Sequence, residues 1–476
     1  MKAAEPVLPL AVPAIAHRAW LLYAAAVASS IPTLWFYLVG EEGILVNSSL
    51  EMAQRGEWLR LWMYGLNAQH GVFANWLVML ISGVVGWAWS PGVVRAIMIG
   101  ATAISGLMVA FLAHRLYRDA ALAALAAAIW VTFGDILFYR GWLGYRDPLL
   151  GMLVFGAIVA LWVAVQSRNA AWLLGTLMFV AAAFLTKGII AYAFVGAAVL
   201  VFLFQRDARK FLLRPIPLFM AALTLCVPIA WSQWVGGDQA HNTRLAAEIA
   251  DKLMPQGVGA YLLKLVAYPL ETLVRLSPLS LLVLWWLWRR EQFNKVFSNP
   301  VVRTALAIAA VAFVPFWLAP QSHFRYLLPI LPLLALVLAY AICTLGPDAQ
   351  RSALRWLWVM VGIKLVLALV LFPIYQHQVR GENYAAVAQA VLKRTAGFPL
   401  YSHDVSAAGQ SVTAYLNIQR LPQPALTFAP TQWSDGYAIS NQPDTALGKV
   451  VVQYPLGGDT LYLLCRGMAC LSPLPK

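Results

Sequence analysis

Apolar segments alternate with short polar stretches along most of this chain, between residues 19 and 374. Runs of about 17–25 apolar residues are long enough to cross the hydrocarbon core of a bilayer as helices. Lysine and arginine gather in the polar stretches that would lie on one side of the membrane. The pattern predicts an all-α polytopic membrane protein with about 11–13 transmembrane helices.

One apolar segment, residues 72–90, does not fit a simple alternation of sides, and it contains Gly83, Gly86 and three tryptophans. The positive-inside rule places the N-terminus and the later arginine clusters in the cytoplasm only if this segment does not reverse the topology. We therefore expect residues 72–90 to be re-entrant, interfacial or paired with a further crossing. The outward-facing parts are then the following: 41–76, 139–148, 236–271, 320–325 and the chain after 375.

The first outward loop, residues 41–76, is the longest polar interruption early in the chain. Its apolar positions, such as Leu45, Leu50 and Met52, can face lipid, while Glu51 and Arg55 can face water. This distribution predicts an amphipathic helix that lies in the membrane interface.

The C-terminal segment, residues 376–476, changes character and is rich in Gln, Ser, Asn and Pro. Short strand-like runs begin near residues 398, 449 and 459, and residues 382–394 follow a helical pattern with Tyr384, Val387, Val391 and Leu392 on one apolar face. These features predict two domains, a membrane domain at 1–375 and a small C-terminal α/β domain at 376–476 on the outer side. Cys465 and Cys470 could form a disulfide there if the compartment is oxidising.

Composition agrees with a membrane protein, because 61% of the residues are hydrophobic and only 11% are charged. The net charge of +14 is explained by cytoplasmic loops and does not call for a nucleic-acid partner. The chain has no P-loop, HExxH or GxSxG motif, and its seven histidines lack metal-ligand spacing. The sequence therefore argues against an ATP-driven machine and against a zinc protease.

Carboxylates at the membrane boundary are the candidates for chemistry. Glu41 and Glu42 open the first outward loop, and Asp147 stands at the outward start of a membrane helix. Solvated loop acids would explain the first two, and helix capping would explain Asp147. Asp135, near the outward end of an apolar run, has Arg140 as its expected partner.

Basic side chains gather in the same outward segments as these acids. Single outward cations usually contact lipid headgroups, but a group of them beside carboxylates suits an anionic phosphate lipid next to a general base. The cations are Arg140, Arg146, Lys187, His241, Arg244, His323 and Arg325.

Several short motifs then resemble those of a known family. The pairs at 41–42 and 51–52 and the Gly-Glu-Trp at 56–58 keep the spacing of the family's first loop. Residues 140–148 resemble its arginine-led loop, and Phe-Leu-Thr-Lys-Gly at 184–188 and Arg-Tyr-Leu-Leu-Pro at 325–329 match its later motifs. On these residues the chain resembles the GT-C-type polyprenyl-phosphate-dependent glycosyltransferases, in the group of bacterial lipid A aminoarabinose transferases and protein O-mannosyltransferases.

The resemblance implies a GT-C-like helical body and a sugar transfer with inversion from a polyprenyl phosphate, such as undecaprenyl phosphate, to a periplasmic lipid, polysaccharide or protein. It implies that Glu41 is the base and that Glu42 or Asp147 orients the acceptor. The groups implied to bind the donor phosphate are His70, Arg140, Lys187, Arg244, His323, Arg325 and Tyr326. Two positions depart from the family: Glu41 replaces the usual aspartate, and His70 lies where the family has a lysine.

The resemblance also implies a bacterial inner membrane protein whose active site and C-terminal domain face the periplasm. No cofactor is required beyond the polyprenyl phosphate carrier, although a divalent metal between Glu41 and Asp147 is compatible with the sequence. The alternatives are a transporter or flippase of lipid-linked sugars and a structural subunit whose tail binds a partner. Few charged residues fall in mid-helix and no repeat is visible, which favours the transferase over the transporter.

Overall fold

The structure is a computed structural model of the 476-residue chain, and it describes residues 13–68, 71–235, 257–378, 384–430, 433–444, 446–456 and 458–471. The chain divides into two compact units that each gather several segments. The helical unit comprises Met1–Ser30, Met98–Trp142 and Arg146–Lys364, and the mixed unit comprises Ile31–Ile97, Leu143–Tyr145 and Leu365–Lys476. The sequence predicted a single boundary, between residues 375 and 376.

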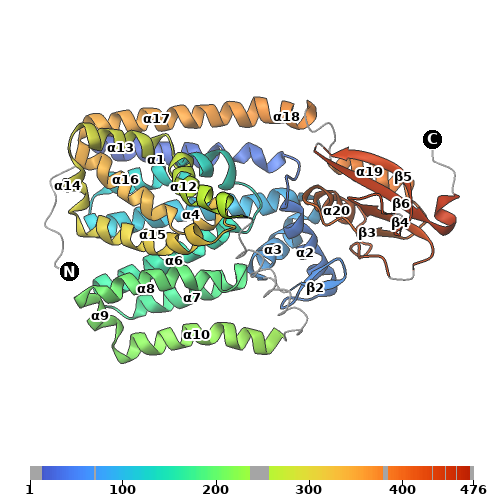
Figure 1. The fold of residues 1–476 in the computed structure, drawn as a ribbon, viewed down its shortest axis with the longest axis horizontal. Helices are drawn as coiled ribbons and strands as arrows, with labels where there is room; N and C mark the ends of the chain where they lie inside the picture. Colours follow the sequence, from blue (N-terminus) through green and yellow to red (C-terminus); the bar gives the residue numbers. More distant parts are fainter. Residues whose placement is uncertain are drawn as a thin grey trace. The chain divides into compact units, whose positions relative to one another are not determined.

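The helical unit is a bundle of long apolar helices, which Figure 1 shows in blue through orange. Helix α4 begins in the mixed unit and continues into this one, and α17 ends at the division between the units. The elements are α1 (Pro13–Ala28), α4 (Ser90–Tyr117), α5 (Ala120–Thr132), η3 (Ile136–Arg140), α6 (Asp147–Ser167), α7 (Ala171–Lys187), α8 (Ile190–Phe204), α9 (Arg206–Leu212), α10 (Pro215–Val235), α12 (Val258–Arg275), α13 (Leu279–Arg289), α14 (Phe293–Phe297), α15 (Pro300–Leu318), η4 (Phe324–Leu327), α16 (Leu331–Leu345) and α17 (Pro347–Val366).

Helices α5 and α6 form the interior of this bundle. The alanine-rich helix α5 packs against α1 and α16, and its small side chains allow the neighbouring backbones to approach closely. Helix α6 packs against α7 and α8, and 94% of its most apolar window is buried within the protein. Apolar side chains on all sides of α6 therefore pack mainly against other helices of the protein.

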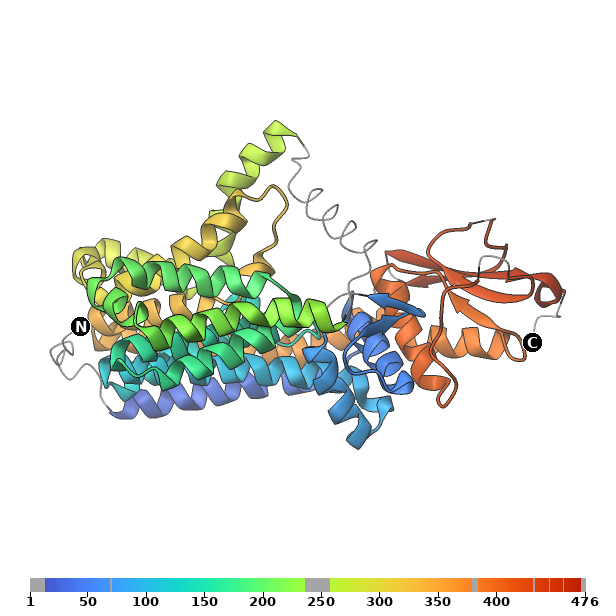
Figure 2. The ribbon, with the colours of Figure 1, turned by 90° about the horizontal axis from the view of Figure 1, so that it is seen from below.

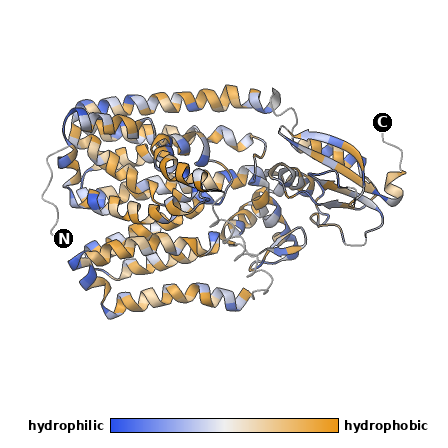
Figure 3. Ribbon diagram, viewed as in Figure 1, coloured by the Kyte–Doolittle hydropathy of each residue, from blue (hydrophilic) through white to orange (hydrophobic). Residues whose placement is uncertain are grey.

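Six helical segments within the described ranges are long and apolar enough to cross a membrane, or up to eight if each of two bent helix pairs is one span. Four further apolar helices are shorter, at 10–17 residues, and the count approaches the predicted 11–13 only if these cross as well. Figure 3 shows the hydrophobic colouring concentrated on the bundle helices. The prediction of a polytopic, mainly helical membrane protein is confirmed.

The ambiguous segment at 72–90 forms a short helix, α3 (Phe73–Val85), and a 3₁₀ turn, η2 (Trp87–Trp89), before α4 starts at Ser90. With 13 residues, α3 is about 20 Å long, which is shorter than the hydrocarbon core of about 30 Å. Gly86 ends the helix with a positive φ of 96°. The segment is thus interrupted before it reaches the length of a full crossing.

Helix α12 is amphipathic and differs from its neighbours in direction. It is bent by 95° from α13, and Figure 2 shows it in yellow-green, leaning away from the bundle helices. The ammonium group of Lys264 donates hydrogen bonds to the carbonyls of Phe316 and Ala319, at the end of α15, at distances of 2.9 and 2.7 Å. The opposite face exposes apolar side chains, which are Val258, Leu262, Leu263, Val266, Leu270 and Val274.

The mixed unit contains the first loop of the sequence and the C-terminal segment. Its elements are η1 (Ile31–Trp35), α2 (Glu42–Arg55), β1 (Leu61–Met63), β2 (Leu66–Ala68), α3, η2, the start of α4, η5 (Leu367–Leu371), α18 (Phe372–Gln378), α19 (Tyr384–Arg394), β3 (Leu400–Ser402), α20 (Ala407–Gln419), β4 (Gly436–Ser440), β5 (Lys449–Leu456), β6 (Asp459–Arg466) and η6 (Gly467–Cys470).

The predicted helix in the first loop exists as α2, and Arg55 is exposed as predicted, but the prediction of the lipid face and of a water-facing Glu51 was wrong. Leu45, Leu50 and Met52 are buried within the protein, and so is Glu51, at 4% exposure. The Glu51 carboxylate accepts hydrogen bonds from Arg55 Nε and the Gly65 amide, at 2.9 and 3.1 Å. Helical periodicity locates an apolar face without showing whether lipid or protein covers it.

The C-terminal segment folds as the predicted small α/β domain. Its four-stranded sheet has the order β3-β4-β6-β5, with β3 and β4 parallel and the other pairs antiparallel. The core contains Tyr384, Val387 and Val391 of α19, with Leu392 packed against it, as the helical pattern predicted. Cys465 and Cys470 form a disulfide.

Helix α2 packs tightly against α20 within the mixed unit. The Asn47 amide donates to the Gln410 carbonyl at 2.8 Å and accepts from Asn417 at 3.0 Å. A Cβ at Gly43 would lie 2.5 Å from the Gln410 carbonyl oxygen, so glycine is required at this crossing. The first loop and the C-terminal domain are therefore held together by backbone contact.

The variant Gly43→Ala is expected to destabilise the mixed unit. Alanine normally stabilises a helix interior by roughly 0.5–1 kcal/mol relative to glycine, but here its methyl group would push against a backbone carbonyl. Thermal unfolding of the purified protein, followed by the loss of monodisperse protein, should show a lower midpoint.

The matched control is Gly83→Ala in α3, where a Cβ would meet nothing within 4 Å. This variant should unfold at the wild-type midpoint or above it. If both variants have the same midpoint, the tight contact between α2 and α20 is not a determinant of stability.

Candidate active site

Asp147 and Lys187 meet because they stand at the same end of a helical hairpin. Asp147 is the first residue of α6 and Lys187 is the last residue of α7, and these helices are joined by a short connection after Ser167. The Lys187 ammonium forms an ion pair with the Asp147 carboxylate. The side chain of Asp147 is 6% exposed and that of Lys187 is 29% exposed, so the cation is the more accessible partner.

The motif at 325–329 places Tyr326 against this ion pair. The Lys187 ammonium lies 4.9 Å from the centroid of the Tyr326 ring, and the Arg325 guanidinium lies 5.6 Å from it. The ring of His323 lies 5.9 Å from that of Tyr326. The segment is the 3₁₀ turn η4, and α16 follows it with Pro332 in its first turn, where a proline is tolerated.

Asp135 is the centre of a second charged group. Its carboxylate pairs with Arg140 at 2.9 Å, as predicted, and also with Arg275 of α12. Arg275 in turn pairs with Glu271 at 2.7 Å, one helical turn earlier. Burial raises the pKa of the Asp135 carboxyl, while the two guanidinium groups oppose that shift.

This second group adjoins η4 as well. The Arg275 guanidinium lies 5.2 Å from the centroid of the Phe324 ring, and the Tyr268 hydroxyl donates to the His323 carbonyl at 3.4 Å. The turn η4 therefore lies next to both charged groups. Its Tyr326 ring contacts Lys187, which pairs with Asp147. Its Phe324 ring contacts Arg275, which pairs with Asp135. Sequence reasoning missed Arg275, whose only local signal is its spacing of four residues from Glu271.

Arg146 adds a further cation immediately before α6. Burial lowers the pKa of its guanidinium to about 10, and the neighbouring Asp147 opposes that shift. Positive charge therefore prevails where α6 begins and α7 ends.

In the mixed unit, Glu42 is fully buried and is held on both oxygens. Arg95 donates from Nε at 2.9 Å and from Nη2 at 2.5 Å, and the amides of Val39 and Gly144 donate at 2.6 and 2.7 Å. Arg95 also donates to the carbonyls at 33, 36 and 37, at 2.6–2.8 Å. The Glu42 carboxylate thus fixes the backbone around it.

Glu41 precedes α2 as its N-cap residue, and its side chain is exposed. Gly40 before it has a φ of +57°, and a Cβ at this position would lie 2.5 Å from the Tyr145 hydroxyl. The backbone that carries Glu41 is therefore fixed on both sides, by the Gly40 turn and by buried Glu42.

Two of the predicted donor-binding residues, His70 and Arg244, lie outside the described residues. Within the described ranges, no three His, Cys, Asp or Glu side chains are grouped so that they could hold a metal ion.

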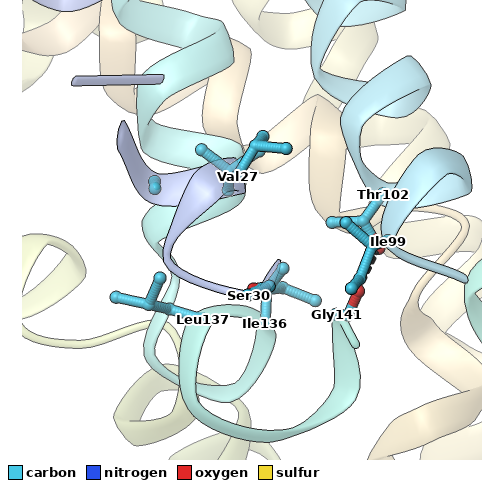
Figure 4. Close-up of a pocket in the computed structure, with 9 residues that line it drawn as sticks. Val27, Ser30, Ile99, Thr102, Ile136, Leu137 and Gly141 are labelled. Atoms are coloured by element: carbon cyan, nitrogen blue, oxygen red, sulfur yellow. Dashed lines mark hydrogen bonds between the residues drawn. The ribbon is translucent and has the colours of Figure 1, made fainter. Parts of the chain in front are cut away.

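A small cavity lies beside η3 and is lined by Ser30, Thr102, Ile136 and Gly141, among others (Figure 4). Its volume is about 10 Å³, and the Thr102 hydroxyl beside it donates to the Gly141 carbonyl at 2.9 Å. Such a volume is about that of one water molecule, so the cavity cannot hold a sugar.

The chain is similar to known proteins both in sequence and in fold. Residues 69–234 match the model of the family described as dolichyl-phosphate-mannose-protein mannosyltransferase. The chain is 31% identical over 333 residues to an undecaprenyl phosphate-alpha-4-amino-4-deoxy-L-arabinose arabinosyl transferase of Pseudomonas aeruginosa, covering 64% of this chain and 57% of the relative. The corresponding protein of Pseudomonas paraeruginosa is 29% identical over 346 residues, which are 67% of this chain and 60% of the relative.

The chain spans about three fifths of the length of these curated relatives. Among solved structures, ArnT from Cupriavidus metallidurans bound to undecaprenyl phosphate aligns with a TM-score of 0.67 and 16% identity, over 94% of this chain and 97% of that one. The archaeal oligosaccharyltransferase AglB from Archaeoglobus fulgidus aligns with a TM-score of 0.51 and 12% identity, over 89% of this chain and 69% of that one.

The structural likeness confirms the predicted GT-C-like fold, and the relatives named here are transferases, not transporters.

The variant Arg95→Met is expected to destabilise the protein strongly, because it leaves the Glu42 carboxylate buried without its countercharge. Removing one partner of a buried ion pair typically costs about 3–5 kcal/mol. Thermal unfolding in detergent should show a clearly lower midpoint than for wild type.

The control for this prediction is Arg60→Met, because the Arg60 side chain is exposed. The double variant Glu42→Gln/Arg95→Met should recover part of the loss, since the buried charge is removed. A wild-type midpoint for Arg95→Met alone would show that the pair does not stabilise the fold.

By its motifs, its relatives and its fold, the chain resembles the GT-C-type polyprenyl-phosphate-dependent glycosyltransferases of the aminoarabinose transferase and protein O-mannosyltransferase group, as its sequence predicted.

Proposed function

We propose that this chain is an integral membrane glycosyltransferase that moves a sugar from a polyprenyl phosphate to an acceptor outside the cytoplasm. The observation that carries the proposal is the contact of Lys187 with both Asp147 and Tyr326, beside Arg325. These residues come from three separate segments, and all three segments belong to the motifs that resemble those of the family. The donor is a sugar on undecaprenyl phosphate, and the acceptor is a lipid, a polysaccharide or a protein.

The phosphate of the donor is both its anchor and its leaving group. Lys187 and Arg325 supply positive charge that stabilises the phosphate as the bond to the sugar breaks. Asp147 orients the Lys187 ammonium, and the Tyr326 ring limits where that ammonium can move. The lipid phosphate already activates the sugar, so no nucleotide sugar is needed at this site.

Glu41 is the proposed general base, and it removes the proton from the acceptor hydroxyl or amine. An exposed carboxylate on a fixed backbone suits this role, whereas the Glu42 and Asp147 side chains are buried. A positioned base contributes about 10²–10⁴-fold to the rate. Attack by the acceptor in a single displacement inverts the configuration at the anomeric carbon.

The proposed location is the bacterial inner membrane, with the site and the C-terminal domain on the periplasmic side. The disulfide between Cys465 and Cys470 supports an oxidising compartment for that domain. A metal ion is not required by this mechanism, because lysine and arginine supply the positive charge.

The variant Glu41→Gln is expected to transfer sugar about a hundredfold more slowly than wild type, because glutamine cannot accept the proton. The assay uses proteoliposomes that contain labelled 4-amino-4-deoxy-L-arabinose linked to undecaprenyl phosphate, with a whole cell-envelope extract that supplies lipids, polysaccharides and proteins as acceptors. It measures the release of undecaprenyl phosphate, so it does not depend on the identity of the acceptor.

Glu291→Gln, at an exposed position in the helical unit, is the matched control and should keep the wild-type rate. A fully active Glu41→Gln would remove Glu41 as the base and make Asp147 the candidate. Labelled donor that changes leaflet without being consumed would instead indicate a transporter.

The variant Lys187→Gln is expected to raise the KM for the donor and to lower kcat, because the phosphate loses charge in both the ground state and the transition state. Lys187→Arg should retain part of the activity. The control is Lys295→Gln, at an exposed lysine of α14, and equal kinetic constants for both glutamine variants would contradict a phosphate-binding role for Lys187.

A further inference from the structure

The C-terminal domain contains an open cleft of about 590 Å³. It lies where α19 and α20 end, and the loops after these helices form its walls. Small-molecule sites commonly have volumes of about 300–1,000 Å³. The cleft is formed entirely by residues between 392 and 423, which belong to the mixed unit. The family motifs do not include any of these residues.

Arg420 is the one charged residue among those that line the cleft, and no carboxylate lines it. Within the described ranges, no Asp or Glu lies within ion-pair distance of Arg420. Its Nε donates to the Gln423 side chain at 3.2 Å, while its buried Nη1 has no hydrogen-bond partner among the described residues. Burial lowers the pKa of this guanidinium.

The remaining lining groups suit the hydroxyls and the apolar face of a sugar. Two helices end at the cleft, and a helix leaves its last carbonyls without intrahelical donors. The carbonyls of Thr395, Ile418 and Arg420 accept from backbone amides of the following turns, so any carbonyl that a ligand meets belongs to the remaining residues of these helix ends. Gln419 and Gln423 add amides that can donate and accept. Phe398 adds an aromatic ring, whose orientation is held by an edge-to-face contact with Tyr437 at 5.8 Å between centroids.

Carbonyl acceptors would repel a bare inorganic anion, whereas the guanidinium alone would not select a neutral sugar. A saccharide with a carboxylate or phosphate group satisfies both parts, because its hydroxyls can meet the carbonyls and its anion can meet Arg420. We propose that this cleft is a binding site for an acidic saccharide, and that it holds the glycan part of the acceptor. The second half of this statement rests on the proposed transferase function, but binding itself does not.

The test is isothermal titration calorimetry on the full chain in detergent, with trigalacturonate as the acidic probe and maltotriose as a neutral trisaccharide. Wild type should bind trigalacturonate at least about tenfold more tightly than maltotriose, and Arg420→Gln should lose about tenfold in affinity for the acidic probe. Arg420→Lys keeps the charge without the planar fork and should bind with intermediate affinity. Lys393→Gln, which removes an exposed cation next to the cleft, should bind as wild type does.

Equal affinity for the two trisaccharides, or an unchanged affinity in Arg420→Gln, would overturn the proposal. Equally strong competition by inorganic phosphate would overturn the saccharide and leave a simple anion site. A folded protein that binds trigalacturonate but releases no undecaprenyl phosphate in the transfer assay would contradict the transferase function and leave the binding site standing. A protein that transfers sugar without binding trigalacturonate would overturn the saccharide-binding site and leave the transferase function standing.

Discussion

The buried ion pair between Glu42 and Arg95 is the interaction on which the first loop depends. Arg95 donates to three backbone carbonyls between Thr33 and Tyr37, and Glu42 accepts from the amides of Val39 and Gly144. Without this ion pair, these backbone amides and carbonyls would be buried away from water without hydrogen-bond partners, which costs free energy. One charged pair therefore fixes three segments that are distant in the sequence, and Glu41 stands on the backbone that it fixes.

In the helical unit, charged residues are brought together by the pairing of two helices. A hairpin of two apolar helices needs no charge for its own packing, yet it brings its first and last residues to one end. Asp147 and Lys187 occupy those two positions, and the 3₁₀ turn η4 places Tyr326 beside them. The apolar helices act as rigid supports, and the charged residues of the candidate site lie at their ends.

Much of this arrangement could be read from the sequence because it is local. The period of α19 located its buried face, and the motif at 184–188 singled out Lys187, which the structure places at the end of α7. Non-local features were out of reach: Glu51 is buried because other segments cover α2, and Arg275 joins Asp135 across 140 residues. Strand β4, buried at every position, shows no alternation by which it could have been recognised.

Helix α12 links the candidate site to its surroundings. One of its faces bonds η4 and the end of α15, and the other exposes six apolar side chains. Such an exposed apolar face suits the membrane interface, where acyl chains would contact the same helix that holds Arg275 against Asp135. Lipid would then be a packing partner of the candidate site, and the thickness and fluidity of the bilayer would become parameters of the geometry around Tyr326.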